Sequence, residues 1–274
     1  MKKEGKTMFN VYYGLTFNPF SKDCDVKYHY KSQDYIQAMS RLEFLKDKKG
    51  FGLITGDPGS GKSYTLKCFV ASLNPNMYKV VYIPISTLTV MDFYRYLSDG
   101  LGLIPKHRKC DMFRQIQDVI LSYHSKNITP VIIVDEAQFI SNSILDDLRI
   151  IFNFDMDTKN YALLILSGQT QLIIQLNRQA HEALRQRIVL NYSFKGLNKD
   201  ETKEYITSRL KCAGCNETIF TDDAIELIYS STNGYLRKIN LLAEMSMILG
   251  AKESQKTING ELVFRAQSDI NITE

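Results

Sequence analysis

Short apolar runs alternate with stretches of helical periodicity through the first two thirds of the chain. The short runs that predict buried strands are 50–56, 80–85, 131–134, 162–166 and 188–192. The run Val131–Val134 contains no polar residue, so we expect both of its faces to be buried, as in a parallel sheet. Apolar positions recur at helical spacing in 32–48, 62–73, 90–102, 111–125 and 143–153. Alternating strands and helices predict a doubly wound α/β fold around a five-stranded parallel sheet.

The pattern changes after Phe194. Beyond this residue the periodicity predicts only helices, over 198–212, 222–231 and 235–250. Before the first strand, residues 9–30 are rich in aromatic side chains and predict an extended segment that packs on another part of the protein. We therefore expect three parts: an N-terminal aromatic segment and helix packed on the core (1–49), an α/β core (50–194) and a small all-helical domain (195–274).

A glycine-rich turn follows the first predicted strand and opens the next predicted helix. It fits the pattern G-x-x-x-x-G-K-[ST], with the residues Gly56, Asp57, Pro58, Gly59, Ser60, Gly61, Lys62 and Ser63. In such a loop, successive backbone N–H groups point inward around phosphate oxygens, and the helix N-terminus adds a favourable dipole. We expect ATP and Mg²⁺ here, with Lys62 at the β- and γ-phosphates, Ser63 on Mg²⁺ and Tyr64 beside the nucleotide. An ordinary glycine turn is the alternative, but it does not explain the strand–turn–helix context.

Two carboxylates follow the apolar strand Val131–Val134. We expect Asp135 to hold the Mg²⁺ shell, and Glu136 to orient and deprotonate the attacking water. Acidic residues often follow strands by accident, so this pattern alone is weak. Together with the phosphate loop it predicts an ATP hydrolase.

Composition adds little. With 34 Lys+Arg against 30 Asp+Glu, the net charge of +4 permits a nucleic-acid partner without requiring one. No run approaches the roughly 18 apolar residues of a membrane helix, so we expect no membrane span. The five scattered cysteines predict reduced thiols and a cytoplasmic location. The C-x-x-C of Cys212 and Cys215 lacks a second ligand pair, so we read it as structural.

The chain resembles the AAA+ ATPases of the ExeA-like group over nearly its whole length. The segments that carry the resemblance are Tyr13–Phe20, Gly50–Gly56, the DEAQ of Asp135–Gln138, Gly168-Gln169, Arg187-Ile188 and Gly234–Asn240, in which Leu236 replaces the group's usual proline. The resemblance implies a P-loop AAA+ core with a five-stranded parallel sheet flanked by helices, followed by a helical lid domain. It also leaves open whether Pro19-Phe20 packs near the adenine or only completes the core.

The same resemblance assigns roles to further polar residues. Gln169 matches the sensor that helps place the attacking water, with Ser167 as the weaker candidate. Arg237 matches the second sensor, which reaches the γ-phosphate from the lid. Arg187, with Arg185 as runner-up, matches the arginine finger that enters a neighbouring subunit's site, where a planar, permanently charged donor stabilises the transferring phosphoryl group. The alternative for each arginine is a surface ion pair. A finger acting on a neighbour implies an ATP-dependent homo-oligomer, either a ring or a helical filament.

A short basic run lies between the second and third predicted strands. It consists of Lys106, His107, Arg108 and Lys109. A solvated loop is the ordinary interpretation. The alternative is sequence-independent contact with the backbone of double-stranded DNA, to which Ser86, Thr87 and Thr89 would contribute hydroxyls, since in DNA-handling AAA+ assemblies the elements after the second core strand commonly face a central channel.

Three functions are compatible with the resemblance. In domain content the chain resembles the transposition helper ATPases of the IstB, TniB and TnsC type, which implies assembly on DNA and recruitment of a transposase. The alternatives are a secretion-associated ATPase of the ExeA type and a replication initiator or loader. The first alternative usually carries a membrane segment and a peptidoglycan-binding region, and the second a winged-helix domain. The sequence ends at Glu274, just past the predicted lid, and on this ground we expect the transposition function.

Overall fold

The computed structural model of the protein describes residues 8–21, 29–84 and 87–270. The chain divides into two compact units. The core unit comprises residues 36–57 and 62–194, and the helical unit comprises residues 1–35, 58–61 and 195–274.

The core unit is built on a five-stranded sheet in which every pairing is parallel and the strand order is β2-β3-β4-β1-β5. The strands are β1 (Gly50–Thr55), β2 (Tyr78–Ile83), β3 (Thr129–Val134), β4 (Leu163–Gly168) and β5 (Ile188–Ser193). The predicted fold class is thus confirmed. Because all strands run the same way, the carboxyl ends of β1, β3 and β4 meet at one edge of the sheet, where the glycine-rich loop and the acidic pair begin.

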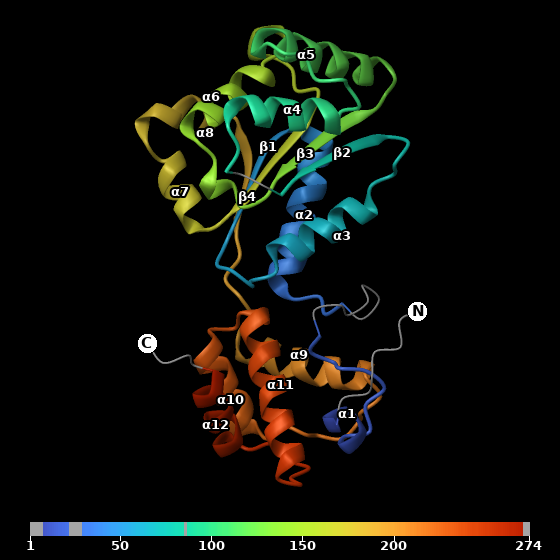
Figure 1. Ribbon diagram of the computed structural model, residues 1–274, viewed down its shortest axis with the longest axis vertical. Helices are drawn as coiled ribbons and strands as arrows, with labels where there is room; N and C mark the ends of the chain where they lie inside the picture. The colour runs from blue at the N-terminus through green and yellow to red at the C-terminus, as the bar shows by residue number, and fades with distance from the viewer. Residues whose placement is uncertain (1–7, 22–28, 85–86, 271–274) are drawn as a thin grey trace. The chain divides into compact units, whose positions relative to one another are not determined.

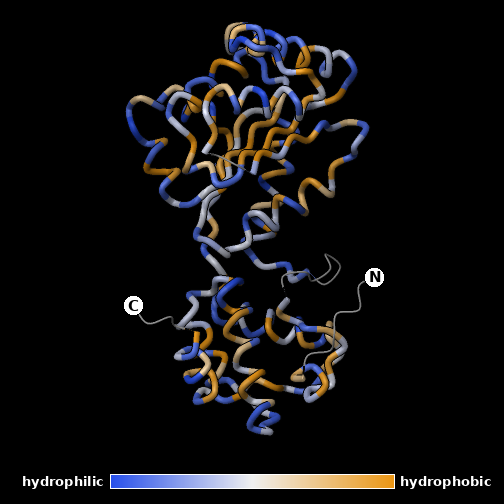
Figure 2. The backbone as a smooth tube through the Cα atoms, viewed as in Figure 1, coloured by the Kyte–Doolittle hydropathy of each residue, from blue (hydrophilic) through white to orange (hydrophobic). Residues whose placement is uncertain are grey.

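Both faces of this sheet are covered by helices (Figure 1), and the strands at the centre of the core unit are mainly hydrophobic (Figure 2). Alternate side chains of each strand point to opposite faces. In β3, Val131 and Ile133 pack with α2 (Gln33–Lys48) and α3 (Lys62–Ser72). Ile132 and Val134 point to the other face. The helices on that face are α4 (Val90–Gly100), α5 (Lys109–Ser125), α6 (Asn142–Ile151), α7 (Thr170–Leu176) and α8 (Glu182–Arg185).

The helical unit has its own apolar core. Its helices are α1 (Met8–Tyr12), α9 (Lys199–Cys212), α10 (Asp222–Thr232), α11 (Leu236–Lys252) and α12 (Gly260–Ile270). The aromatic N-terminal segment contributes Phe9, Leu15 and Phe20 to this core. We had expected this segment to pack on the α/β core. A run of aromatic residues predicts burial, but it does not identify the surface that buries it.

Several elements depart from the sequence-based boundaries. The helices α7, α8 and α12 were not predicted, nor was α1, which lies at the start of the segment that we expected to be extended. The 3₁₀ turns η2 (Ala137–Phe139), η3 (Asp155–Asp157) and η4 (Gln179–His181) were not predicted either. Strand β2 runs from Tyr78 to Ile83 instead of the predicted 80–85, and residue 85 lies outside the described part. Within the described ranges, no helix combines the length and apolar character needed to cross a membrane.

Candidate active site

The glycine-rich loop has the backbone that its sequence requires. Gly56, Gly59 and Gly61 all adopt positive φ angles, of 151°, 84° and 107°. The Lys62 side chain is buried, and its Nζ donates to the carbonyl oxygens of Gly56 at 2.7 Å and Asp57 at 2.9 Å. Ser60 Oγ is buried and has no hydrogen-bond partner among the described residues. A buried ammonium at the loop and a buried hydroxyl with no hydrogen-bond partner among the described residues fit a site that receives an anion such as a phosphate.

Asp135 is the centre of a hydrogen-bond network at the carboxyl ends of β2, β3 and β4. Its Oδ2 accepts from Ser63 Oγ at 3.0 Å and from Tyr82 Oη at 2.7 Å. Its Oδ1 accepts from Ser167 Oγ at 2.8 Å and from the backbone N–H of Glu136 at 3.0 Å. Only 5% of Asp135 is exposed. Four donors compensate the cost of burying this group, and they fix a carboxylate oxygen beside Ser63, the donor set that a hard cation such as Mg²⁺ prefers.

Tyr82 is a member of this network that the sequence analysis did not identify. Burial, together with its hydrogen bond to the Asp135 carboxylate, raises the pKa of Tyr82 above its ordinary value. In the parallel register of β2 and β3, Tyr82 pairs with Ile133. Ile133 lies two residues before Asp135. The sequence analysis predicted no strand order, so side-chain alternation alone could not place this hydroxyl near the acidic pair.

Glu136 is the second residue after β3 and adopts the left-handed conformation, with φ 50° and ψ 38°. Its side chain is exposed, and its Oε2 accepts from Gln138 Nε2 at 2.7 Å. Gln138 Oε1 in turn accepts from the backbone N–H of Gln169 at 3.0 Å. The structure therefore links the proposed general base to the end of β4 through a residue to which the sequence analysis gave no role.

The two sensor candidates at the end of β4 differ in environment. Ser167 is fully buried and bonds Asp135 directly. Gln169 is half-buried at the N-cap of α7, and its backbone N–H donates to Gln138 Oε1. Gln169 thus lies at the same sheet edge as Asp135 and Glu136, and its backbone is joined to Glu136 through Gln138.

The two arginine-finger candidates are held differently. The Arg187 guanidinium donates to the carbonyl oxygen of Arg149 at 2.6 Å, in the last turn of α6, and lies 5.8 Å from the centre of the Phe51 ring. Burial, and then the charge of Arg149, lower the pKa of Arg187. Arg185 is exposed, and its Nη1 lies 3.4 Å from the Leu176 carbonyl oxygen.

Arg237 belongs to the helical unit. It is exposed in the first turn of α11, and its backbone N–H donates to the Gly59 carbonyl oxygen at 3.4 Å within the same unit. A Cβ atom on Gly59 would lie 2.7 Å from Cβ of Arg237. Gly59 is therefore needed both for its positive φ and for this close approach.

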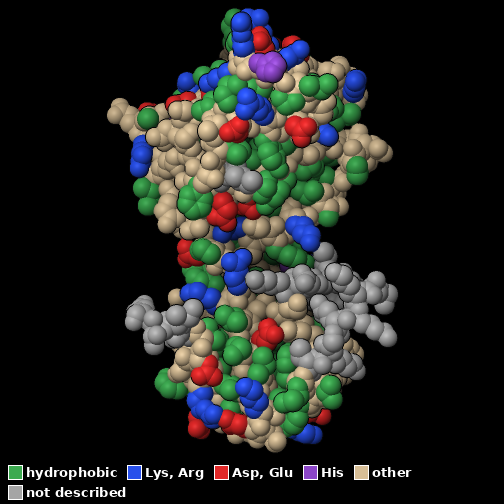
Figure 3. Space-filling model, viewed as in Figure 1, with side chains coloured by type: hydrophobic (Ala, Val, Ile, Leu, Met, Phe, Trp, Pro, Cys, Tyr) green, Lys and Arg blue, Asp and Glu red, His purple; other side chains and the backbone are tan. Residues whose placement is uncertain are grey.

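Residues considered for DNA contact fall into two groups. Thr87, Lys106, His107 and Arg108 are exposed, whereas Ser86 lies outside the described residues. Lys109 begins α5 and forms an ion pair with Asp147 at 2.7 Å, and Thr89 caps α4 through the N–H of Asp92. Figure 3 shows Lys and Arg side chains among acidic ones at the α5 end of the core unit.

The AAA domain family matches residues 45–176. The chain is also 31% identical over 264 residues to General secretion pathway protein A of Aeromonas hydrophila, a match that covers 94% of this chain and 48% of that protein. This chain therefore spans about half the length of that relative. Both findings support an ExeA-like AAA+ protein.

Solved structures show the same fold at low sequence identity. Cdc6p from Pyrobaculum aerophilum matches with a TM-score of 0.70 and 15% identity, over 93% of this chain and 71% of that one. The Drosophila ORC bound to DNA gives a TM-score of 0.72 and 14% identity, over 100% and 68%. The RuvB branch migration motor of Thermotoga maritima gives a TM-score of 0.56 and 18% identity, over 90% and 74%. These likenesses bear on the fold alone.

Proposed function

We propose that the chain is a Mg²⁺-dependent AAA+ ATPase. The observation that carries this proposal is the network at Asp135, which joins the Ser63 hydroxyl of the glycine-rich loop to the end of β3. A turn that occurred by chance would not place its serine 3.0 Å from a buried carboxylate that already accepts three other hydrogen bonds.

The loop residues bind the nucleotide. Lys62 exchanges its two carbonyl acceptors for oxygens of the β- and γ-phosphates, and the backbone N–H groups between Gly56 and Ser63 cradle the same phosphates. Ser60 supplies a buried hydroxyl that lacks a partner among the described residues. Nucleotide binding thus supplies phosphate oxygens as acceptors for the loop N–H groups, the Lys62 ammonium and the Ser60 hydroxyl.

The acidic pair divides two tasks. Ser63 and Asp135 would hold Mg²⁺, which when bound neutralises negative charge on the phosphate oxygens. Glu136 accepts the proton of the attacking water, and its exposed position leaves its carboxylate accessible to that water. Gln169 and Arg237 serve as the sensors, and Arg185 or Arg187 acts in a neighbouring subunit.

Calorimetric titration with Mg·ATP tests the binding site. Lys62→Ala is expected to weaken binding by at least about 10-fold, because the buried ammonium is the charge that faces the phosphates. Lys67→Ala is the matched control, since Lys67 is exposed on the same helix. Equal affinity of the two variants would contradict the assignment of the loop.

For the macromolecular partner, we propose duplex DNA bound by an ATP-dependent homo-oligomer that recruits a transposase. The exposed Lys106 and Arg108 between α4 and α5 support backbone contact, and one protein with a similar fold was solved bound to DNA. The transposase itself rests on the family resemblance alone. The identity to General secretion pathway protein A favours the alternative, a secretion-associated ATPase with a protein partner. The likeness to Cdc6p and ORC keeps an initiator-like role as a further alternative.

DNA binding with a non-hydrolysable ATP analogue, with ADP and without nucleotide separates these functions. Steeply salt-dependent binding that requires the ATP analogue, and that weakens in a Lys106→Ala/Arg108→Ala variant, would support DNA as the partner. No binding in any nucleotide state at low salt would contradict DNA as the partner and favour a protein partner.

A further inference from the structure

The side-chain amide of Gln138 bridges the carboxylate of Glu136 and the end of β4. Its Nε2 donates to Glu136 Oε2 at 2.7 Å, and its Oε1 accepts from the backbone N–H of Gln169 at 3.0 Å. A backbone N–H can only donate, so the amide oxygen must face Gln169 and the amide nitrogen must face Glu136. The direction of both hydrogen bonds is therefore fixed by the chemistry of the partners.

The backbone around this bridge is shaped to bring the groups together. Glu136 adopts φ 50° and ψ 38°, a left-handed conformation that is unfavourable for a residue with a Cβ atom. The Glu136 N–H bonds Asp135 Oδ1 at 3.0 Å, and the Phe139 N–H bonds the Glu136 carbonyl oxygen at 3.1 Å. Strain at an exposed acidic residue, held by bonds on both sides, fits a functional constraint on where this carboxylate lies.

Gly168 makes room for the other end of the bridge. A Cβ atom at this position would lie 2.7 Å from Gln138 Oε1 and 3.3 Å from the Gln138 backbone nitrogen. Glycine at the last residue of β4 thus allows the amide to reach the N–H of Gln169. The end of β4 therefore has the space that the Gln138 side chain, on the turn after β3, needs to form this hydrogen bond.

We propose that Gln138 is a positioning residue for the general base Glu136 in ATP hydrolysis. The proposal rests on the proposed ATPase function. An exposed glutamate samples several rotamers, and only some place its carboxylate where it can take a proton from the attacking water. The Gln138 amide holds the Glu136 carboxylate in one of these positions. Its second hydrogen bond fixes that position relative to the end of β4, where Ser167 and Gln169 lie.

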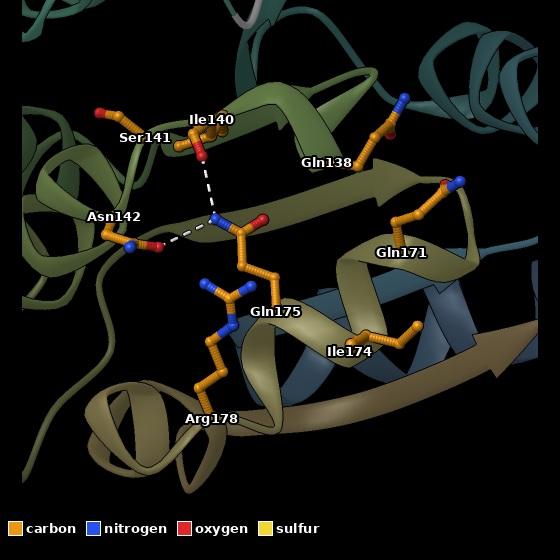
Figure 4. A pocket seen from close by; sticks show the side chains of 8 residues that line it. All are labelled: Gln138, Ile140, Ser141, Asn142, Gln171, Ile174, Gln175 and Arg178. Atoms are coloured by element: carbon orange, nitrogen blue, oxygen red, sulfur yellow. Dashed lines mark hydrogen bonds between the residues drawn. The ribbon is translucent and has the colours of Figure 1, made fainter.

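The surroundings of Gln138 supply a matched control. Gln138 lies on η2 at one end of a groove of about 590 Å³, and Gln171 lies on the facing helix α7 (Figure 4). Gln175, further along α7, donates to the Ile140 carbonyl oxygen and to Asn142 Oδ1 (Figure 4). Gln171 is an exposed amide in the same groove, and its replacement changes the groove without touching the bridge.

A double-mutant cycle tests the proposal. Gln138→Met preserves side-chain length but removes both hydrogen bonds, and Gln171→Met is the control. We expect Gln138→Met to lower the single-turnover rate of ATP hydrolysis about 10- to 100-fold, because a misplaced base loses much of its contribution. Its affinity for a fluorescent ATP analogue and its thermal unfolding midpoint should match those of Gln171→Met. In a Glu136→Gln background, Gln138→Met should have no further effect on the rate.

Three results would overturn the proposal. These are a Gln138→Met rate within twofold of the wild type, a rate loss that repeats in full in the Glu136→Gln background, and a rate loss explained by weaker analogue binding. Each of them leaves the ATPase function intact, since the wild-type protein still hydrolyses ATP. A wild-type protein with no ATP hydrolysis would overturn both proposals, and that outcome is distinguished by the wild-type measurement alone.

Discussion

At the scale of single residues, Asp135 shows how a buried charge is retained. An ionised carboxylate with 5% exposure would be strongly destabilising without partners. Two hydroxyls act on Oδ2, and one hydroxyl and one backbone N–H act on Oδ1. Hydrogen bonds to charged groups contribute about 1.5–3 kcal/mol each. Loss of one donor should therefore be measurable in stability as well as in nucleotide binding.

Tyr82→Phe removes one of these donors and preserves the ring. We expect the free energy of unfolding to fall by about 1–2 kcal/mol, because Asp135 Oδ2 loses the 2.7 Å bond. Urea denaturation measures the change. Tyr96→Phe is the control, because its ring is exposed to a similar degree as that of Tyr82, 38% against 45%. Equal stability of the two variants would show that Tyr82 contributes nothing to the network.

Protonation of His29 makes the free energy of unfolding depend on pH. Burial, followed by the nearby charges of Lys31 and Arg209, lowers the pKa of His29 from 6.5 to about 4. The unfolded chain therefore binds the proton more tightly, so the free energy of unfolding should decrease as the pH falls from about 6.5 towards 4. This term is absent above that range.

His29→Phe preserves an aromatic ring beside Tyr35, whose ring centre lies 4.1 Å away. Between pH 7 and pH 4.5 the variant should lose about 1–2 kcal/mol less stability than the wild type, a figure reduced for solvent screening of a half-exposed ring. Chemical denaturation at several pH values measures this difference. His107→Gln, at an exposed position, should follow the wild-type curve. Parallel curves for wild type and His29→Phe would contradict the assignment.

At the scale of secondary structure elements, Arg187 joins the end of one helix to the start of a strand. It precedes β5 and donates to a carbonyl in the last turn of α6, where carbonyls lack helical partners. A cation at a helix C-terminus also interacts favourably with the helix dipole. This contact gives Arg187 a role in its own subunit.

Arg187→Ala is expected to lower the free energy of unfolding by about 1–2 kcal/mol, through loss of the helix-end bond and the contact with the Phe51 ring. Arg185→Ala should change it by less than about 0.5 kcal/mol, since Arg185 is exposed. Urea denaturation of both variants decides the matter. A larger loss for Arg185→Ala would reverse these structural roles.

The turn before α11 depends on a glycine. Gly234 has a φ of +72°, and a Cβ atom there would lie 1.9 Å from the Leu197 carbonyl oxygen. Gly14 has a φ of +66°, and a Cβ atom on Gly14 would have no other atom within 4 Å. Gly14→Ala therefore isolates the cost of the backbone conformation, about 1 kcal/mol, whereas Gly234→Ala adds a backbone clash and should cost about 3 kcal/mol or more. Similar thermal unfolding of the two variants would contradict this difference.

Hydrophobic periodicity predicted the elements that have a strong pattern and did not predict the short helices and turns. The strand Val131–Val134 is apolar throughout and was predicted within β3. Helix α7 has seven residues and η2 has three, too few to establish a helical period. The bridge from Gln138 to Gln169 could not be predicted, because it depends on the left-handed turn at Glu136 and on the close approach at Gly168. Local sequence does not specify such tertiary contacts.

At the scale of the whole molecule, the chain combines an α/β core unit, most of which is matched by the AAA domain family, with a helical unit that has a hydrophobic core of its own. The change of pattern after Phe194 coincides with the division between Phe194 and Lys195. Residues 1–35 and 58–61 were not assigned to the helical unit from sequence, since that grouping depends on long-range packing. The motif residues Lys62, Ser63 and Asp135, by contrast, were predictable because each lies at a fixed position relative to a strand or helix end.

The central claim is that this chain hydrolyses ATP with Glu136 as the base. Phosphate release from Mg·ATP by the wild type and by Glu136→Gln, with analogue affinity measured in parallel, tests it most directly. We predict Mg²⁺-dependent release by the wild type, and a rate at least about 100-fold lower for Glu136→Gln at unchanged affinity. Release by Glu136→Gln at the wild-type rate, or no release by the wild type, would contradict the account.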